Sequence, residues 1–188
     1  MTQPYRIAVV DTETTGLYPS RDRLVEIAIM LLEVDGAGRL LRTLETYEEL
    51  NDPGMPIPAE ATAIHGITDA MVKGCRIDAQ RVARMLTGAD LVVAHNSGFD
   101  KGFVRQLVPG VDALLWGCSC RGIPWRRLYA SLENTRLQHL AARLEVCTGT
   151  AHRALGDVET TVNLILGTDP QGNSHLLHLL TRKLPPRV

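Results

Sequence analysis

Two acidic residues, Asp11 and Glu13, follow directly after an apolar run that ends at Val10. Because alternate residues of a strand point to the same face, both carboxylates are expected on one side of the strand end. Two carboxylates placed in this way repel each other unless a divalent cation lies between them. Thr14-Thr15-Gly16 follows, and adds hydroxyl groups and a backbone that a ligand can approach closely. An isolated Asp-x-Glu pair is more often a solvated surface feature, but this pair emerges from an apolar run.

A further acid, Asp100, comes soon after the apolar stretch Leu91-Val92-Val93-Ala94. We expect Asp100 in the first turn of a helix that Asn96 or Ser97 caps. The alternative is that this carboxylate only stabilises the helix terminus through the helix macrodipole.

His152 and Asp157 form another candidate pair, near the start of a long helical pattern. At about 100° per residue, two helical residues at this spacing would lie about 140° apart around the axis. The two side chains can therefore share a site only if His152 lies on the loop or in the first turn. A lone histidine here would otherwise be a helix cap or a satisfied surface residue.

The elements that must position these residues alternate between strand and helix character. Strands are predicted at 6–10, 24–34, 40–47, 91–94 and 113–116, and a turn at Gly36-Ala37-Gly38 joins the second to the third. Helices are predicted at 79–86, 99–107, 135–144, 151–166 and about 174–184, and residues 51–58 are expected to form a loop. Three strands followed by alternating helices and strands predict an α/β protein with a mixed sheet flanked by helices.

Composition limits the kinds of protein that this chain can be. Its 188 residues are 45% hydrophobic and 22% charged, which excludes a disordered chain, a collagen-like fibre and a small disulfide scaffold. The net charge of −1 means that any nucleic acid must be held locally rather than by global attraction. The four cysteines match no zinc-binding spacing. No apolar stretch reaches membrane-spanning length and no signal peptide is recognisable, so we expect a cytoplasmic protein without a membrane partner.

Taken together, the motifs resemble those of the DEDD 3′–5′ exonuclease superfamily, and most closely its DEDDh branch, which includes the proofreading epsilon subunit of bacterial DNA polymerase III. The resemblance covers roughly residues 7–166. The matching segments are Asp11-Thr12-Glu13-Thr14-Thr15-Gly16, Ile64-His65-Gly66-Ile67-Thr68, Asn96-Ser97-Gly98-Phe99-Asp100 and His152-Arg153-Ala154-Leu155-Gly156-Asp157.

This resemblance implies an RNase H-like fold with a central mixed five-stranded sheet. It also implies that Asp11, Glu13, Asp100 and Asp157 bind two divalent cations, Mg²⁺ or Mn²⁺, and that His152 is the general base of phosphodiester hydrolysis. Without metal, four acids that face one pocket would repel, so metal binding should be coupled to the stability of the site.

The substrate implied by the resemblance is a single-stranded or frayed 3′ end, from which 5′-mononucleotides are released. Thr14, Thr15 and His65 correspond to positions that contact the terminal nucleotide. Ile67 and Phe99 are candidates for apolar contact with its base, with core packing as the alternative.

Basic residues after the second motif are candidates for contacts with the phosphates behind the end, and Trp125 is a candidate platform for base stacking. The alternative is that this charged region is simply solvated. The basic residues are Lys101, Arg105, Arg121, Arg126 and Arg127.

Three functional alternatives stay open. DNA is favoured over RNA as substrate, and the RNA alternative is an oligoribonuclease-like or RNase T-like trimming enzyme. A non-catalytic nucleic-acid-binding module would be expected to have a degraded motif, whereas all five site residues are intact.

A role in DNA replication and proofreading, or in DNA repair, follows from the resemblance. However, Trp116-Gly117-Cys118-Ser119 resembles the variety found in some stand-alone exonucleases. Association with a polymerase remains possible, but no tethering tail is evident. We expect a single exonuclease domain over residues 1–188, with a motif-bearing core at about 6–167.

Overall fold

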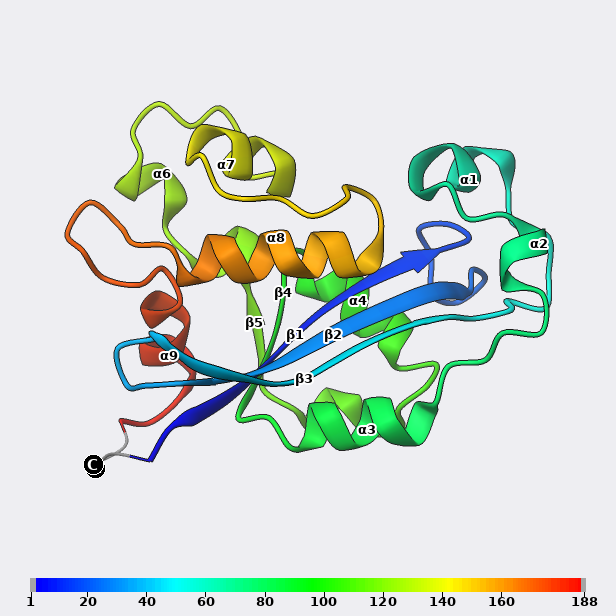
Figure 1. The fold of residues 1–188 in the computed structure, drawn as a ribbon, viewed down its shortest axis with the longest axis horizontal. Coiled ribbons are helices and arrows are strands. Elements are labelled where there is room, and N and C mark those ends of the chain that lie inside the picture. Colours follow the sequence, from blue (N-terminus) through cyan, green and yellow to red (C-terminus); the bar gives the residue numbers. More distant parts are fainter. Residues whose placement is uncertain (1–2, 187–188) are drawn as a thin grey trace.

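A five-stranded mixed sheet runs through the centre of the protein, which the computed structural model describes over residues 3–186. The strand order is β3-β2-β1-β4-β5 (Figure 1). The pairs β1–β2 and β2–β3 are antiparallel, whereas β1–β4 and β4–β5 are parallel. This arrangement confirms the predicted α/β class and five-stranded mixed sheet. The strands are β1 (Tyr5–Thr14), β2 (Leu24–Val34), β3 (Leu40–Leu50), β4 (Leu91–Ala94) and β5 (Trp116–Cys118).

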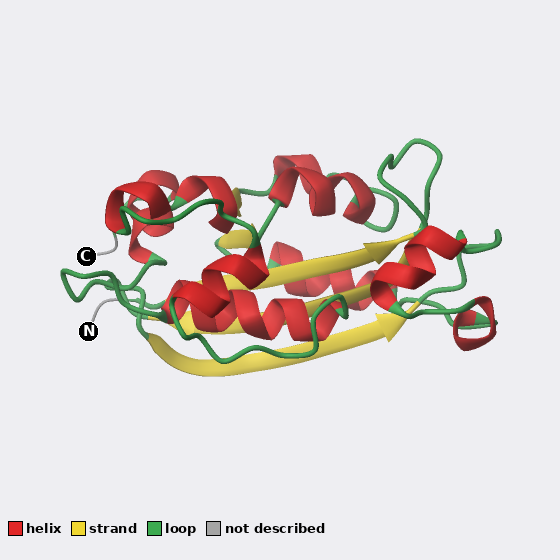
Figure 2. Cartoon of the chain, turned by 90° about the horizontal axis from the view of Figure 1, so that it is seen from above, coloured by secondary structure: helices red, strands yellow, loops and turns green. Residues whose placement is uncertain are grey.

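Helices cover both faces of the sheet (Figure 2). Within residues 3–186, no helix is both long and apolar enough to cross a membrane. The helices that the sequence predicted are α3 (Ala79–Thr87), α4 (Ser97–Val104), α7 (Leu137–Arg143), α8 (Ala154–Leu166) and α9 (Leu177–Lys183). Short helical segments that it did not predict are α1 (Ala59–His65), α2 (Asp69–Val72), η1 (Val111–Ala113), α5 (Ser119–Gly122) and α6 (Trp125–Leu128).

The alternation of β1 divides its side chains between two apolar cores. Ile7 and Val9 belong to the core that contains residues of α8 and α9, whereas Ala8 and Val10 belong to the core that contains residues of α3 and α4. The helix α8 lies along β1 and β2 in both views (Figures 1 and 2). Because side chains alternate along a strand, odd-numbered residues further along β1 face α8, and even-numbered residues face the layer of α3 and α4.

At its carboxyl end, β1 extends beyond its parallel neighbour β4. It pairs with β4 only at Ile7 to Val9, yet it continues to Thr14. The strand β4 ends at Ala94, and α4 begins at Ser97. The first turn of α4 therefore lies beside the end of β1, and the carboxyl ends of parallel strands are where open α/β sheets bind ligands.

Some predicted boundaries were wrong at element ends. The strand expected at 113–116 begins instead at Trp116, because residues Val111–Ala113 form a 3₁₀ turn. The helix expected from residue 151 begins at Ala154, because His152 has φ 57° and so cannot belong to a right-handed helix.

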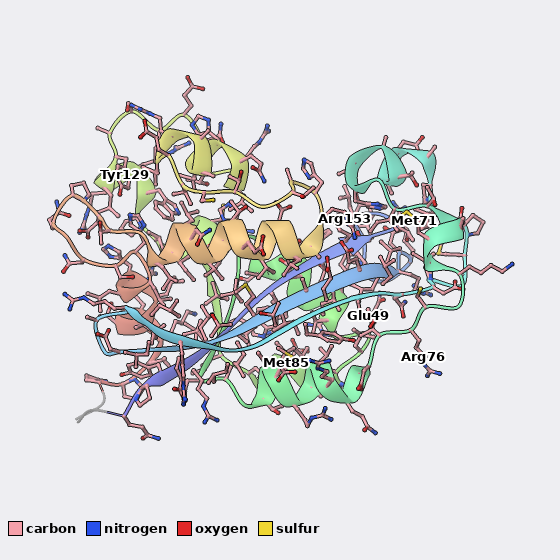
Figure 3. All side chains as sticks on the ribbon, viewed as in Figure 1. Glu49, Met71, Arg76, Met85, Tyr129 and Arg153 are labelled. Atoms are coloured by element: carbon pink, nitrogen blue, oxygen red, sulfur yellow. The ribbon has the colours of Figure 1, made fainter. Side chains whose placement is uncertain are left out.

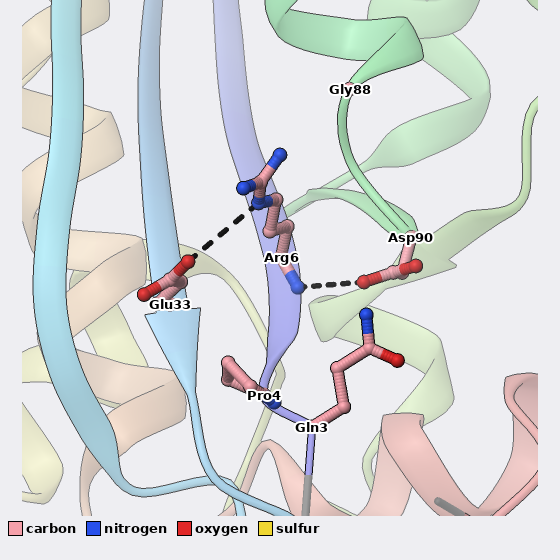
Figure 4. A pocket seen from close by; sticks show the side chains of 6 residues that line it. All are labelled: Gln3, Pro4, Arg6, Glu33, Gly88 and Asp90. Carbon is pink, nitrogen blue, oxygen red and sulfur yellow. Dashed lines mark hydrogen bonds and ion pairs between the residues drawn. The ribbon is translucent and has the colours of Figure 1, made fainter.

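The opposite end of β1 carries a hollow of about 320 Å³ (Figure 4). There Arg6 Nε lies 3.7 Å from Glu33 Oε1, and the Arg6 backbone N–H donates to Asp90 Oδ2 at 2.8 Å. Arg6 precedes Asp11 by five strand residues, or roughly 17 Å. The hollow is therefore separate from the strand end that carries Asp11 and Glu13.

Candidate active site at the end of the first strand

Three carboxylates from two elements gather where β1 ends. Asp11, Glu13 and Asp157 each offer an oxygen, and these atoms all lie within 4.8 Å of one another. Asp11 and Glu13 lie at alternate positions of β1 after Ile7 and Val9, so their side chains point to the same face of the sheet and face α8. Asp157 comes from the first turn of α8, and the strand and the helix meet at the acids.

A fourth carboxylate, that of Asp100, reaches the same strand end from α4. It is buried, and its Oδ1 accepts a hydrogen bond from the Thr12 hydroxyl at 3.0 Å. Thr12 is the strand neighbour of Asp11, so its side chain points to the opposite face of the sheet, toward α4. The negative charge of Asp100 is one of the causes that raise the pKa of Asp11, so the two acids act on each other.

The crowding of these acids changes their protonation. Burial, followed by the charges of Asp100 and Glu13, raises the pKa of Asp11 well above its ordinary value. Burial and the charge of Asp157 raise the pKa of Glu13 to about 8, and burial raises the pKa of Asp100 to about 7. These acids therefore bind protons tightly unless another positive charge compensates them. The donor set is made of hard carboxylate oxygens, which fits Mg²⁺ or Mn²⁺.

Both oxygens of Asp157 are held in place by hydrogen bonds. Gln138 Nε2 donates to Oδ1 at 2.9 Å, and the backbone N–H of His152 donates to Oδ2 at 3.2 Å. Burial raises the pKa of Asp157, and both hydrogen bonds oppose that shift. Gln138 lies on α7, so a third helix helps to orient this carboxylate.

His152 lies on the turn before α8, which meets the condition that the sequence set for sharing a site with Asp157. Its side chain is exposed, and its φ of 57° lies in the left-handed region. The turn is pressed against the helix, since a Cβ built on Gly156 would lie 2.0 Å from the Thr150 carbonyl oxygen. Only glycine at position 156 allows this approach.

An apolar pocket of about 360 Å³ adjoins the carboxylates. Two of its wall residues are strongly exposed apolar side chains, Leu17 at 71% and Ile64 at 60%. Of the predicted site residues, the pocket includes Glu13, Thr14, Thr15, His65 and Phe99. Its other lining residues are Thr12, Gly16, Leu17, Pro58, Glu60, Ala61 and Ile64.

His65 presents a buried ring nitrogen at this pocket. Its Nδ1 accepts a hydrogen bond from the Ile67 backbone N–H at 3.0 Å, so the neutral ring carries its proton on Nε2. Among residues 3–186, the buried Nε2 has no well-formed hydrogen bond. Burial lowers the pKa of His65, and the nearby Thr14 carbonyl opposes that shift. The imidazole of His65, one of the lining residues, is therefore held in its neutral form.

Ile67 does not line the pocket, contrary to the expected contact with a base. Its side chain has no exposed surface and belongs to a small core with Val25, Ile57 and Val72. Ile64, three residues earlier, offers the exposed apolar surface instead. The unpredicted helix α1 places it there. Leu17 also lines the pocket, and an apolar residue directly after Gly16 of the first motif was the signal that the sequence offered for it.

The expected stacking platform is also absent at Trp125. This indole is 1% exposed, and its Nε1 donates to the Ser119 carbonyl at 2.7 Å. Lys101 and Arg105 both pair with Asp112, which leaves them less available to a phosphate. Trp125 is therefore a core residue, and these two cations are paired with an acid, whereas the alternative interpretation held that this region is simply solvated.

The sequence and the fold match known exonucleases. Residues 8–114 match the family model RNase_T, an exonuclease. The DNA polymerase III PolC-type protein of Bacillus subtilis is 32% identical over 171 residues, covering 84% of this chain and 11% of that protein. A DNA polymerase III subunit epsilon-like protein of Rhodobacter capsulatus is 35% identical over 176 residues, covering 84% and 23%. This chain therefore spans less than a quarter of the length of either curated relative.

Among solved structures, exonuclease X in complex with 5′ overhanging duplex DNA is 27% identical with a TM-score of 0.62, and the match covers 94% of this chain and 92% of that one. Escherichia coli exonuclease I with a dT13 oligonucleotide shares the fold, at 19% identity and a TM-score of 0.65, over 84% of this chain and 39% of that one. The family match, together with the motifs of the DEDD superfamily, identifies this chain as a member of the RNase_T exonuclease family.

Proposed function

We propose that the chain is a metal-dependent 3′–5′ exonuclease that hydrolyses phosphodiester bonds at the 3′ end of single-stranded or frayed DNA and releases 5′-mononucleotides. The observation that carries this proposal is the group of three carboxylates, with oxygens within 4.8 Å of one another, beside an apolar pocket of about 360 Å³. That volume is in the range of small-ligand sites. An acidic site that joins an apolar wall suits a nucleotide whose phosphate is held by cations and whose base is buried.

Asp11, Glu13, Asp100 and Asp157 would hold two divalent cations. Their raised pKa values support this assignment, because four crowded acids, each buried or partly buried, are unfavourable in the ionised form without a counter-charge. When bound, the cations supply Lewis acidity and neutralise charge on the phosphoryl group and the leaving oxygen. Gln138 and the His152 backbone keep Asp157 oriented for this role.

His152 would take the proton of the attacking water. Histidine is the side chain that most often acts as a general base in enzymes. Its turn lies directly before α8, and its backbone contacts Asp157. Because the imidazole is exposed, it can reach a substrate phosphate that lies over the carboxylates.

The pocket would hold the terminal nucleotide. Leu17, Ile64 and Phe99 provide apolar surface for the base. His65 and the Thr14 and Thr15 segment line the same pocket and provide polar groups for the sugar and phosphate. The exposed state of Leu17 and Ile64 is consistent with this role, since large apolar side chains at a pocket rim often mark ligand contacts.

DNA is proposed as substrate because the 27% identical exonuclease X structure is a complex with duplex DNA. Trimming of RNA is the alternative outcome of the same test. The PolC-type and epsilon-like relatives make association with a polymerase a further proposal. The single-domain organisation expected from the sequence is likewise proposed for residues 1–188.

The test is digestion of matched DNA and RNA oligonucleotides, labelled at the 3′ or the 5′ end, in Mg²⁺ or Mn²⁺. We expect immediate release of labelled mononucleotide from the 3′ label and a descending ladder from the 5′ label. Asp11→Asn should nearly abolish the reaction, because it removes an anionic cation ligand. Rapid cutting of a circular single strand, or robust activity in excess EDTA, would contradict the proposal.

A further inference from the structure

Glu26 is a fully buried acid beside the site, and no step of the proposed reaction uses it. It lies on β2 directly opposite Glu13 of β1 in the antiparallel register, and its exposed fraction is 0%. Directly opposed residues of neighbouring strands share a face of the sheet, so Glu26 faces α8 as Glu13 does. A buried carboxylate needs charged or hydrogen-bonding partners.

The partners of Glu26 all come from the start of α8. Arg153 Nε lies 3.1 Å from Oε1 and 3.2 Å from Oε2, and the Ala154 backbone N–H donates to Oε2 at 2.8 Å. Arg153 is the N-cap residue of α8, and a guanidinium cannot accept a hydrogen bond. A carboxylate on another element thus caps this helix, where its negative charge also suits the helix dipole.

The segment that Glu26 holds carries two of the proposed site groups. His152 immediately precedes Arg153, and Asp157 follows it by one helical turn. His152 has φ 57°, a conformation that a residue with a side chain keeps only when its surroundings impose it. Figure 3 shows Arg153 where α8 begins, over the ends of β1 and β2. The contacts of Arg153 and Ala154 join α8 to the strand next to β1.

We propose that Glu26 and Arg153 are positioning residues, which fix His152 and Asp157 relative to the carboxylates of β1. This inference rests on the proposed function for its catalytic consequence, but its structural content does not depend on activity. The ion pair joins the helix that carries one cation ligand to the sheet that carries two others. Without it, the start of α8 can shift while the rest of the helix stays packed in the core.

The decisive variant is the double substitution Glu26→Gln with Arg153→Gln. Removing one partner alone would leave a buried unpaired charge and could unfold the protein, whereas removing both charges avoids that penalty. Arg153→Lys is the conservative companion, since it keeps the charge but loses the forked guanidinium geometry. The matched control is Glu33→Gln with Arg42→Gln. This pair also joins a buried β2 glutamate to an arginine, at 2.7 Å, but near the far end of the strand.

Three measurements compare these variants with the wild type. Hydrogen exchange of the metal-free proteins should show faster exchange at residues 152–157 in the Glu26/Arg153 double variant alone. Mn²⁺ affinity by calorimetry should fall about 10- to 100-fold, the usual effect of losing a partner that orients a metal ligand. With saturating Mn²⁺, kcat on a 3′-labelled oligonucleotide should fall about 10- to 100-fold while KM stays within about threefold. Arg153→Lys should recover part of each loss.

The control pair should leave all three measurements within about twofold of the wild type. Unchanged exchange at residues 152–157 in the double variant would overturn the proposal, as would equal losses in the control pair. Because exchange is measured without metal or substrate, it decides the positioning role even if the wild type degrades no nucleic acid. A wild type that degrades no nucleic acid would refute the proposed function, and the positioning role would then be decided by hydrogen exchange alone.

Discussion

The Thr12 hydroxyl donates a hydrogen bond to Asp100 Oδ1 at 3.0 Å, and so joins two acidic motifs that lie 88 residues apart. Thr12 lies between Asp11 and Glu13 on β1, but its side chain points to the other face of the sheet. It therefore reaches α4 while its two neighbours face α8. One strand end thereby organises acids from both helix layers.

Thr12→Val should loosen the placement of Asp100 with little change in shape. The hydrogen bond from Thr12 opposes the burial that raises the Asp100 pKa, so its loss should raise that pKa further. We expect Mn²⁺ affinity to fall about 10- to 100-fold, as for other groups that orient metal ligands. Calorimetric titration at pH 7 measures the affinity. Thr12→Ser keeps the hydroxyl and should bind Mn²⁺ within about threefold of the wild type, and equal losses in both variants would exclude the hydrogen bond as the cause.

His152→Ala should separate proton transfer from metal binding. We expect kcat to fall by roughly 10²–10⁴-fold, the usual contribution of a positioned base, while Mn²⁺ affinity and folding stay nearly unchanged. Steady-state kinetics at saturating Mn²⁺ and calorimetric Mn²⁺ titration provide the test. A variant with kcat within about threefold of wild type would remove His152 from the mechanism.

Gly156→Ala should destabilise the protein and displace the turn that carries His152. The added Cβ would lie 2.0 Å from the Thr150 carbonyl oxygen, and backbone cannot give way as a flexible side chain can. We expect a loss of about 1–3 kcal/mol in the free energy of unfolding, the usual cost of overpacking. Urea denaturation measures it. Gly98→Ala is the control, because its Cβ would meet nothing within 4 Å, and alanine in a helix should stabilise by up to about 1 kcal/mol. Equal stability of the two variants would contradict the steric argument.

Acid should weaken the fold through His95. Burial lowers the His95 pKa, and the hydrogen bond to the Thr135 carbonyl only partly opposes that shift. The unfolded chain then binds a proton more readily than the folded one below a pH of about 6.5. The stability that neutral His95 contributes is therefore present above that pH and is lost as pH falls toward the lower folded pKa.

The corresponding measurement is urea unfolding of wild type and His95→Asn in EDTA from pH 5.0 to 7.5. The variant should be less stable at pH 7.5, because the contacts to Ser119 and Thr135 are lost. The difference between the two proteins should shrink toward pH 5. A difference that stays constant across this range would show that His95 does not titrate with folding.

The acidic groups themselves could be predicted from the sequence because their placement depends on local rules. The period of a strand fixes that Asp11 and Glu13 share a face. The buried strand at 91–94 and the capping residues after it placed Asp100 in the first turn of a helix. The spacing from His152 to Asp157 required a turn before the helix, and the structure has one. The mixed sheet flanked by helices followed from the pattern of apolar runs and helices, whereas its strand order came only from the structure.

Tertiary structure decided what those rules leave open. Ile64 rather than Ile67 borders the pocket, because α1 turns Ile64 outward and ends at His65, after which Ile67 enters a core with Val25 and Val72. Glu26 comes from a strand remote in sequence from Arg153, and Gln138 comes from α7, the helix before the one that carries Asp157. Local sequence patterns predict which side chains share a face of a single strand or helix. The partner of a buried charge is set by which elements pack together, because only a folded interior makes an unpaired charge costly enough to require one.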